Sequence, residues 1–167
     1  SEEMGRALYA GPWLASAVAA VRATAAAGAP FVPGGRTAAV ALPWPGHDVG
    51  FALDAAGRVT GAQDHVLSAP LADVLLLPAA RDGEVVLVAV EGVEAAAEPG
   101  LDATTLLGTV TVEGAGGDVL GSLPDGALDA VRDDVLVTWA ADALGAARAV
   151  LALGPAGHPG VPQGSAR

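Results

Sequence analysis

Residues 59–113 read VTGAQDHVLSAPLADVLLLPAARDGEVVLVAVEGVEAAAEPGLDATTLLGTVTVE, and this stretch decides the fold. Short β-branched and aliphatic runs alternate in it with turn residues, which is typical of a sheet of short strands. Alanine-rich sequence with helical spacing flanks it at residues 2–27 and 126–153. The order helix, sheet, helix predicts an α+β chain with N-terminal helices, a central β domain and one long C-terminal helix.

The central region predicts about seven short strands, which favours an antiparallel β-sandwich or barrel. The continuous apolar runs at 74–77 and 85–90 are expected to be strands buried on both faces. Residues 109–113 alternate strictly, so their valines should be buried and their threonines exposed. The other expected strands are residues 37–42, 49–53, 58–61 and 93–97. The Gly-rich segment 114–123 is expected to be a connection.

Helices are expected at residues 2–9, 12–27 and 126–153, and the Gly- and Pro-rich segment 154–167 reads as a tail or linker. In the long helix one side carries Val131, Val135, Trp139, Ala143 and Val150. If this side is exposed, it should cause self-association, because a large exposed apolar stripe usually marks an interaction surface.

The charge of the chain excludes several classes of partner. Its formal net charge is −11, and all eight of its basic residues are arginines. Neither nucleic acid nor an anionic membrane surface is therefore an expected partner, since both attract basic proteins. The apolar segment 7–21 is shorter than the roughly 20 residues of a membrane span, so no membrane span is expected.

Generic catalytic and metal-binding motifs are absent from the sequence. It contains no cysteine, and His47, His65 and His158 lack the spacing of metal ligands, so no metal is expected. Trp44 lies between two prolines in a rigid loop. It is either a plug on the core, which we favour, or a face for a flat ligand.

Six short motifs, in order, nevertheless resemble the flavin-dependent acyl-CoA dehydrogenases, particularly divergent actinobacterial-type members. Residues 2–8 resemble the family's EELGRAL, and residues 12–15 the P-F-L-A/T that follows. Residues 59–61, 66 and 72–77 match its L-T-G, V and A-A-D-x-L-L-V pattern. The remaining motifs are at residues 39–45, 101–114 and 141–147.

The resemblance implies three parts: residues 1–36 as the end of an N-terminal helical domain, 37–123 as the central β domain, and 124–167 as the start of a C-terminal helical domain with its tail. It also implies an oxidoreductase of lipid metabolism in the cytoplasm. Such an enzyme removes hydrogens from Cα and Cβ of an acyl-CoA thioester, with FAD as cofactor. No residue of this sequence matches the family's glutamate base, so no catalytic residue is assigned.

By the same resemblance, two loops would contact the flavin. The family's T-E-P loop corresponds to Pro43, Trp44 and Pro45, preceded by a matching Leu42. Its W-I-T/S loop appears as residues 65–68, with Val66 in place of the Ile and a hydroxyl one residue late, at Ser68. The candidate cofactor-binding residues are therefore Leu42, Trp44, Pro45, Val66 and Ser68. Pro43 has neither the N–H nor the hydroxyl of the family's Thr.

Two functions follow from the resemblance, and a third reading does not depend on it. The first is an acyl-CoA dehydrogenase, incomplete or inactive as this chain, that oxidises an acyl-CoA with FAD. The second is a non-catalytic subunit that pairs with another acyl-CoA dehydrogenase-like subunit in a homo- or hetero-oligomer. The third is a β-sandwich domain with helical flanks and no ligand. We expect the chain to be a fragment or a truncated product.

Overall fold

The computed structural model describes residues 1–29, 35–100 and 104–153. They divide into two compact units, one spanning residues 10–137 and the other joining residues 1–9 to the chain from residue 138 onward. The predicted tail 154–167 and part of the motif at 101–104 lie outside the described residues. The division into parts at residues 36 and 123 stays a prediction.

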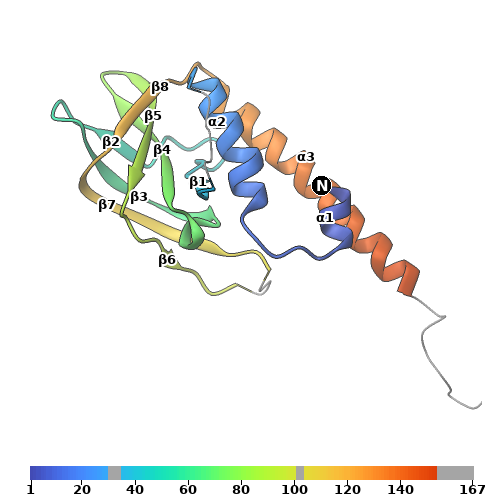
Figure 1. Ribbon diagram of the computed structural model, residues 1–167. Helices are drawn as coiled ribbons and strands as arrows, with labels where there is room; N and C mark the ends of the chain where they lie inside the picture. The colour runs from blue at the N-terminus through green and yellow to red at the C-terminus, as the bar shows by residue number, and fades with distance from the viewer. Residues whose placement is uncertain (30–34, 101–103, 154–167) are drawn as a thin grey trace, which may run out of the picture. The chain divides into compact units, whose positions relative to one another are not determined.

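The larger unit is built on one strongly curved, eight-stranded sheet (Figure 1). Its strand order is β6-β7-β3-β2-β4-β5-β8, and β1 pairs with β4 off this path. The strands are β1 (Ala38–Val40), β2 (Phe51–Leu53), β3 (Arg58–Leu67), β4 (Val74–Arg81), β5 (Glu84–Glu91), β6 (Ala96–Ala97), β7 (Leu107–Gly116) and β8 (Asp118–Ser122). The predicted α+β class is confirmed.

Two apolar clusters lie on the two faces of this sheet, and β4 contributes to both. Leu75 and Leu77 belong to one cluster, whereas Val74 and Leu76 belong to the other. Successive side chains of a strand point to opposite faces, so a continuous apolar run fits a strand that is covered on both sides. Val110 and Val112 of β7 are buried, as its alternating pattern predicts.

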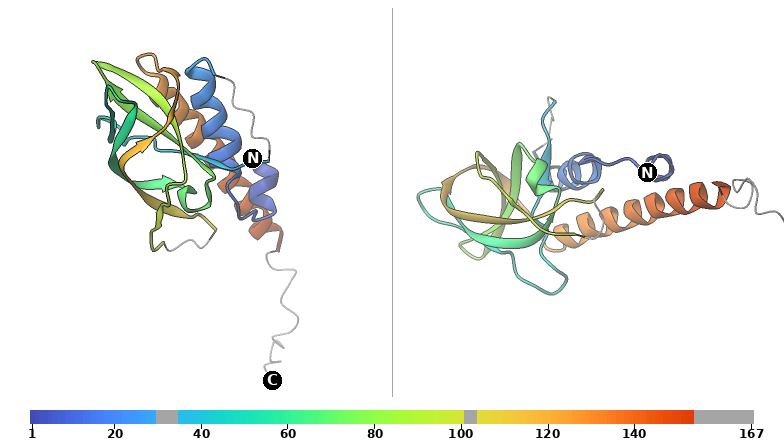
Figure 2. Two further views of the ribbon diagram at one scale, coloured as in Figure 1. Left: turned by 60° about the vertical axis from the view of Figure 1, so that its left-hand side comes forward. Right: turned by 90° about the horizontal axis from the view of Figure 1, so that it is seen from below.

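Helices cover the second cluster (Figure 2). A π-helix, η1 (Leu14–Ala20), continues into α2 (Val21–Ala26). The first turns of α3 (Ala127–Leu153) lie beside them, and an ion pair of 2.5 Å joins Arg22 of α2 to Asp134 of α3. The short 3-10 helix η2 (Ala69–Leu71) leads from β3 to β4.

The structure corrects several sequence predictions. Residues 118–122 are not a connection but β8, which pairs with β5. This edge strand reads DVLGS, and with one glycine and two polar residues among five it lacks the apolar pattern that marks a strand in the sequence. The sheet is not wholly antiparallel, because β1 and β2 both run parallel to β4. Pattern alone does not encode the direction of neighbouring strands.

The predicted apolar side of the long helix is also partly wrong. Val131 and Val135 are buried in the second cluster, 2% and 7% exposed. Trp139 and Val150 of the same predicted side are exposed, at 41% and 65%, and further exposed apolar residues of α3 include Leu136, Leu144 and Leu151. The helix is rich in alanine, leucine and valine, so periodicity did not show how far along it the predicted side is covered.

In the smaller unit the short helix α1 (Glu2–Arg6) packs against α3 through two glycines. A Cβ added to Gly145 would lie 1.9 Å from the carbonyl oxygen of Glu2, and one added to Gly5 would lie 1.8 Å from that of Asp142. An ion pair between Arg148 and Glu2 accompanies this crossing. The predicted helix 2–9 therefore exists, but it ends at Arg6.

Among the described helices, α3 is long and apolar enough to cross a membrane by length and composition. The most apolar 18-residue window of α3 has a mean hydropathy of 1.5, and 11% of this window is buried. Core helices of soluble proteins have the same length and composition, so this finding by itself assigns no membrane.

Candidate functional site

Three consecutive residues before β2 are each held by a different side chain. The amide of Gln63 donates to the carbonyl oxygen of Leu42 at 2.6 Å. The guanidinium of Arg132 donates to the carbonyl oxygen of Pro43 at 2.5 Å. The ring of Trp44 meets the ring of His65 edge to face, with centroids 5.8 Å apart and an interplanar angle of 72°. The loop is therefore fixed from two sides, by β3 and by α3.

The prolines add to this rigidity. Pro43 and Pro45 each have a fixed φ, and each restricts the residue before it to extended conformations. Pro43 is buried, whereas Pro45 is exposed. Trp44 is 58% exposed, so it is not a plug on the core. The alternative that the sequence left open, an available aromatic face, is the one that the structure supports.

In the second loop predicted to contact the flavin, Val66 and Ser68 are buried, unlike Trp44 in the first. Val66 is 1% exposed and belongs to the apolar cluster enclosed by the sheet. Ser68 is 6% exposed, has a φ of 56°, and its N–H donates to the carbonyl oxygen of Leu106 at 2.7 Å. Trp44 and His65 bring the two loops into contact, whereas Val66 and Ser68 are buried. A role of these two residues in binding stays a prediction.

A carboxylate holds His65 in place beneath Trp44. Glu98 Oε1 accepts the backbone N–H of His65 and the hydroxyl of Thr109, both at 2.8 Å. Its other oxygen lies 3.5 Å from His65 Nε2. The hydrogen bond from the His65 N–H, followed by that from Thr109, holds the pKa of Glu98 below its usual value. His65 itself lies in a bulge where the register of β3 and β7 shifts, with a φ of 59°.

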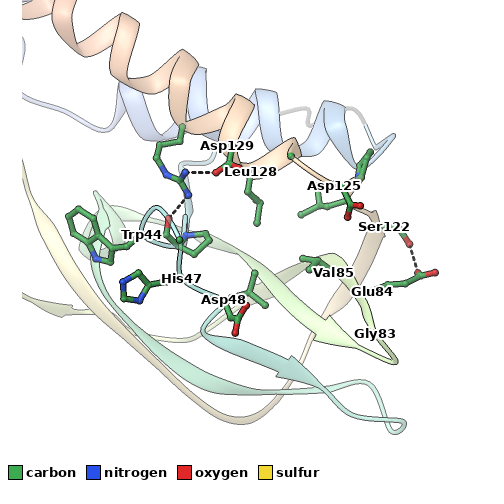
Figure 3. Close-up of a pocket in the computed structure, with 17 residues that line it drawn as sticks. Trp44, His47, Asp48, Gly83, Glu84, Val85, Ser122, Asp125, Leu128 and Asp129 are labelled. Carbon is green, nitrogen blue, oxygen red and sulfur yellow. Dashed lines mark hydrogen bonds and ion pairs between the residues drawn. The ribbon is translucent and has the colours of Figure 1, made fainter.

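An open cavity of about 870 Å³ begins at Trp44 (Figure 3). Its wall continues through His47 and Asp48 to the turn between β4 and β5, and then through the end of β8 to the first turns of α3. Of the five predicted site residues, only Trp44 lines it. This size is in the range of pockets that hold small organic ligands.

The ionisable residues of the cavity wall are mostly acidic. Asp48, Glu84, Asp125 and Asp129 line it, and Arg132 is the one arginine among the lining residues. The guanidinium of Arg132 is already shared between Asp129 Oδ1, at 2.5 Å, and the Pro43 carbonyl. The wall can therefore stack on a flat ring, but it repels an anion.

Sequence reasoning missed Arg132 and the Trp44–His65 contact. The spacing of Asp129 and Arg132 on the predicted helix, i and i+3, is a signal that could have marked an ion pair. Nothing in the sequence pattern links residues 44 and 65. In the described part of the chain no group of three or more His, Asp or Glu side chains could hold a metal ion.

No protein-family model and no curated protein matches this sequence. Solved structures do match it in three dimensions. The ChsE4-ChsE5 complex from Mycobacterium tuberculosis and a Tcur3481-Tcur3483 steroid ACAD variant each have 24% identity and a TM-score of 0.69 over 91% of this chain. Butyryl-CoA dehydrogenase from Megasphaera elsdenii has 17% identity and a TM-score of 0.68 over 90%.

The chain spans less than half the length of these proteins, covering 46%, 46% and 49% of them in turn. At such identities the likeness is one of fold. It extends across the N-terminal helices, the sheet and the long helix, because about nine-tenths of the chain is covered. The described chain therefore has the fold of the corresponding part of the acyl-CoA dehydrogenases.

Proposed function

We propose that this chain serves the α,β-dehydrogenation of an acyl-CoA thioester, as one part of a flavin-dependent assembly. The observation that carries the proposal is the likeness in fold to acyl-CoA dehydrogenases over 91% of the chain. The site adds support, because the two loops that resemble flavin-contacting loops meet at an exposed aromatic ring above a ligand-sized cavity. When bound, FAD would supply the acceptor for the hydride that leaves Cβ.

The described residues fit one part of FAD and not another. The exposed ring of Trp44 fits a flat isoalloxazine ring. The diphosphate does not fit, because the cavity wall carries four carboxylates and its arginine is already engaged. Positive charge for the diphosphate would therefore come from outside these residues. Within this chain the work of the site is to hold and orient a ring, not to bind phosphate or move a proton.

Because these residues fit the ring of FAD but not its diphosphate, the second function, a non-catalytic partner subunit, is favoured over an enzyme active by itself. The first solved structure described above is itself a complex, of ChsE4 with ChsE5. By analogy, a second acyl-CoA dehydrogenase-like subunit would supply the base, the diphosphate contacts and most of the acyl-CoA site. A cytoplasmic location, with neither nucleic acid nor membrane as partner, accompanies this proposal and agrees with the net charge of −11.

Expression with excess FAD tests the proposal. The chain is purified by itself and after co-expression with a complete acyl-CoA dehydrogenase-like subunit from the same genome. Flavin absorbance reports bound cofactor, and reduction of a dye acceptor reports turnover of acyl-CoA substrates. We expect no turnover and little retained FAD for the chain alone, and both for the co-purified complex.

Two results would count against the proposal in different ways. Turnover by the chain alone would show that it is the enzyme and not a partner subunit. A chain that neither co-purifies with any such subunit nor changes its activity would leave the ligand-free β-sandwich as the correct description.

A further inference from the structure

Trp44 is positioned as a ligand-binding residue would be. The loop carries its ring between two prolines, and three contacts from Gln63, Arg132 and His65 hold three successive residues. Because the ring is already ordered, a ligand that stacks on it loses little conformational entropy on binding.

The contact with His65 leaves most of the indole available. The rings meet edge to face, at an angle of 72°, and Trp44 keeps 58% of its surface exposed. The cavity begins at this surface. An exposed indole at the mouth of a ligand-sized cavity can bind a planar π-system by stacking, largely independent of its substituents.

The charges of the wall then select among such ligands. Asp48, Glu84, Asp125 and Asp129 contribute negative charge, and the guanidinium of Arg132 bonds to Asp129 and to Pro43. An added phosphate would face these carboxylates without a counter-charge. The cavity should therefore prefer an uncharged ring to the same ring carrying phosphate.

We propose that Trp44 is a stacking residue for an uncharged isoalloxazine-type ring, and that the acidic wall of its cavity discriminates against the phosphorylated forms of that ring. The choice of ring rests on the proposed function, whereas stacking and charge selection rest on this cavity. The Trp44 position resembles that of the glutamate in the T-E-P loop of acyl-CoA dehydrogenases, so this contact belongs to this chain and is not carried over from them.

Equilibrium dialysis of the purified chain against riboflavin, FMN and FAD at low salt tests both parts. The three ligands share one ring and differ in phosphate. We expect riboflavin to bind best, and the affinity for FMN and FAD to rise with ionic strength while that for riboflavin stays constant. Quenching of riboflavin emission on binding would report the contact with an indole.

Substitutions measure the contribution of the Trp44 ring to binding separately from that of the acidic cavity wall. Trp44→Ala should weaken riboflavin binding by about tenfold or more, and Trp44→Phe by less than about threefold, since a flat face remains. Trp139→Ala is the matched control, because Trp139 is also exposed, at 41%, but does not line the cavity. Glu84→Gln with Asp125→Asn should improve FMN and FAD binding and leave riboflavin binding unchanged.

The proposal is overturned if no form of the ring binds, if Trp44→Ala binds riboflavin as the unmodified chain does, or if FAD binds better than riboflavin at low salt. Circular dichroism verifies that each variant is folded, and Trp44→Phe serves if Trp44→Ala is not. None of these measurements uses turnover. A partner subunit that fails to restore activity would therefore sink the proposed function and leave this inference standing, and the reverse also holds.

Discussion

Glu98 shows how one carboxylate fixes a bulge in the sheet. It accepts the N–H of His65, where the register of β3 shifts, and the hydroxyl of Thr109 on β7. Both bonds stabilise the ionised form, so the pKa of Glu98 is lowered on folding. A lowered carboxyl pKa stabilises the fold above the unfolded pKa, and this stabilisation is lost as the pH falls through the folded pKa.

Thr109→Val removes one of these donors. We expect the pKa of Glu98 to rise toward its ordinary value, because the carboxylate loses one of the hydrogen bonds that stabilise its ionised form. The variant should be less stable than the unmodified chain at neutral pH, and the difference should vanish in acid, where Glu98 is protonated in both. NMR titration of the Glu98 carboxyl carbon and thermal unfolding against pH measure this. Thr111→Val is the control, and an unchanged Glu98 pKa would refute the assignment.

At the residue scale, the sequence predicted the loop but not its contacts. Two prolines around a tryptophan predict a rigid, turn-like segment, and in the structure this segment is a loop with a turn at residues 45–46. The partners of that segment come from β3 and α3, 21 and 89 residues away in the sequence. Such long-range side-chain contacts leave no periodic signal, so the sequence could not decide between a plug and an open face for Trp44.

β4 pairs with three other strands of the sheet. It runs parallel to β1 and β2 and antiparallel to β5, and its side chains enter both apolar clusters. Its start is fixed by Asp73, whose carboxylate accepts the N–H of Thr37 at 2.7 Å, just before β1. The backbone N–H and hydroxyl of Thr37 lower the pKa of Asp73. The hydrogen bonds between Thr37 and Asp73 therefore fix the starts of the parallel strands β1 and β4 relative to each other.

Leu76→Ala in β4 is expected to lower the free energy of unfolding by about 2–5 kcal/mol. Leu76 is fully buried, at 0% exposed, between the sheet and the covering helices. Leu71→Ala, at a position 44% exposed, should cost much less. Urea unfolding monitored by circular dichroism compares them, and equal losses would mean that the helices do not cover this face.

Gly145→Ala should disrupt the crossing of α1 and α3, because the new Cβ would lie 1.9 Å from a backbone oxygen of α1. Backbone cannot swing away as a side chain can, so we expect α1 to detach and its amides to exchange faster with deuterium. Gly116→Ala is the control, since nothing lies within 4 Å of its added Cβ. Unchanged protection of residues 2–6 in the Gly145 variant would contradict this packing.

At the scale of elements, the predictions succeeded where side-chain pattern determines the element. The runs in β4 and β5, the alternation in β7 and the long helix were all recognisable. β8 was missed because its sequence, DVLGS, shows no clear alternation of apolar and polar residues. β3 was predicted to end at Gly61, whereas it continues to Leu67. On the predicted apolar side of α3, Val131 and Val135 are buried, whereas Trp139 and Val150 are exposed, so the periodicity indicated the side but not how far along the helix it is covered.

For the whole molecule, the exposed face of α3 is the feature that most affects behaviour in solution. Leu136, Leu144 and Leu151 recur at helical spacing and are 53%, 47% and 79% exposed. These exposed leucines, called here the apolar strip, favour association over a monomeric state. The net charge of −11 opposes it, so association should strengthen as salt is added.

Light scattering over a range of protein concentrations tests this association. We expect the mean mass to rise with concentration for the unmodified chain, and to fall markedly for Leu136→Glu, which places a charge in the strip. Val119→Glu in β8, at an apolar position 43% exposed, is the control for added charge alone. A constant monomer mass in all three would remove the strip as an interaction surface.

The pairing of β3 with β7 has a consequence for synthesis on the ribosome. Gly116, the last residue of β7, follows Leu67, the last of β3, by 49 residues. At about 5–20 residues per second, β3 waits roughly 2–10 s for its partner. Throughout that interval its edge is open to other nascent chains on the same polysome. The bulge at Asp64 and His65 interrupts the edge, and so shortens the stretch along which a wrong partner could pair.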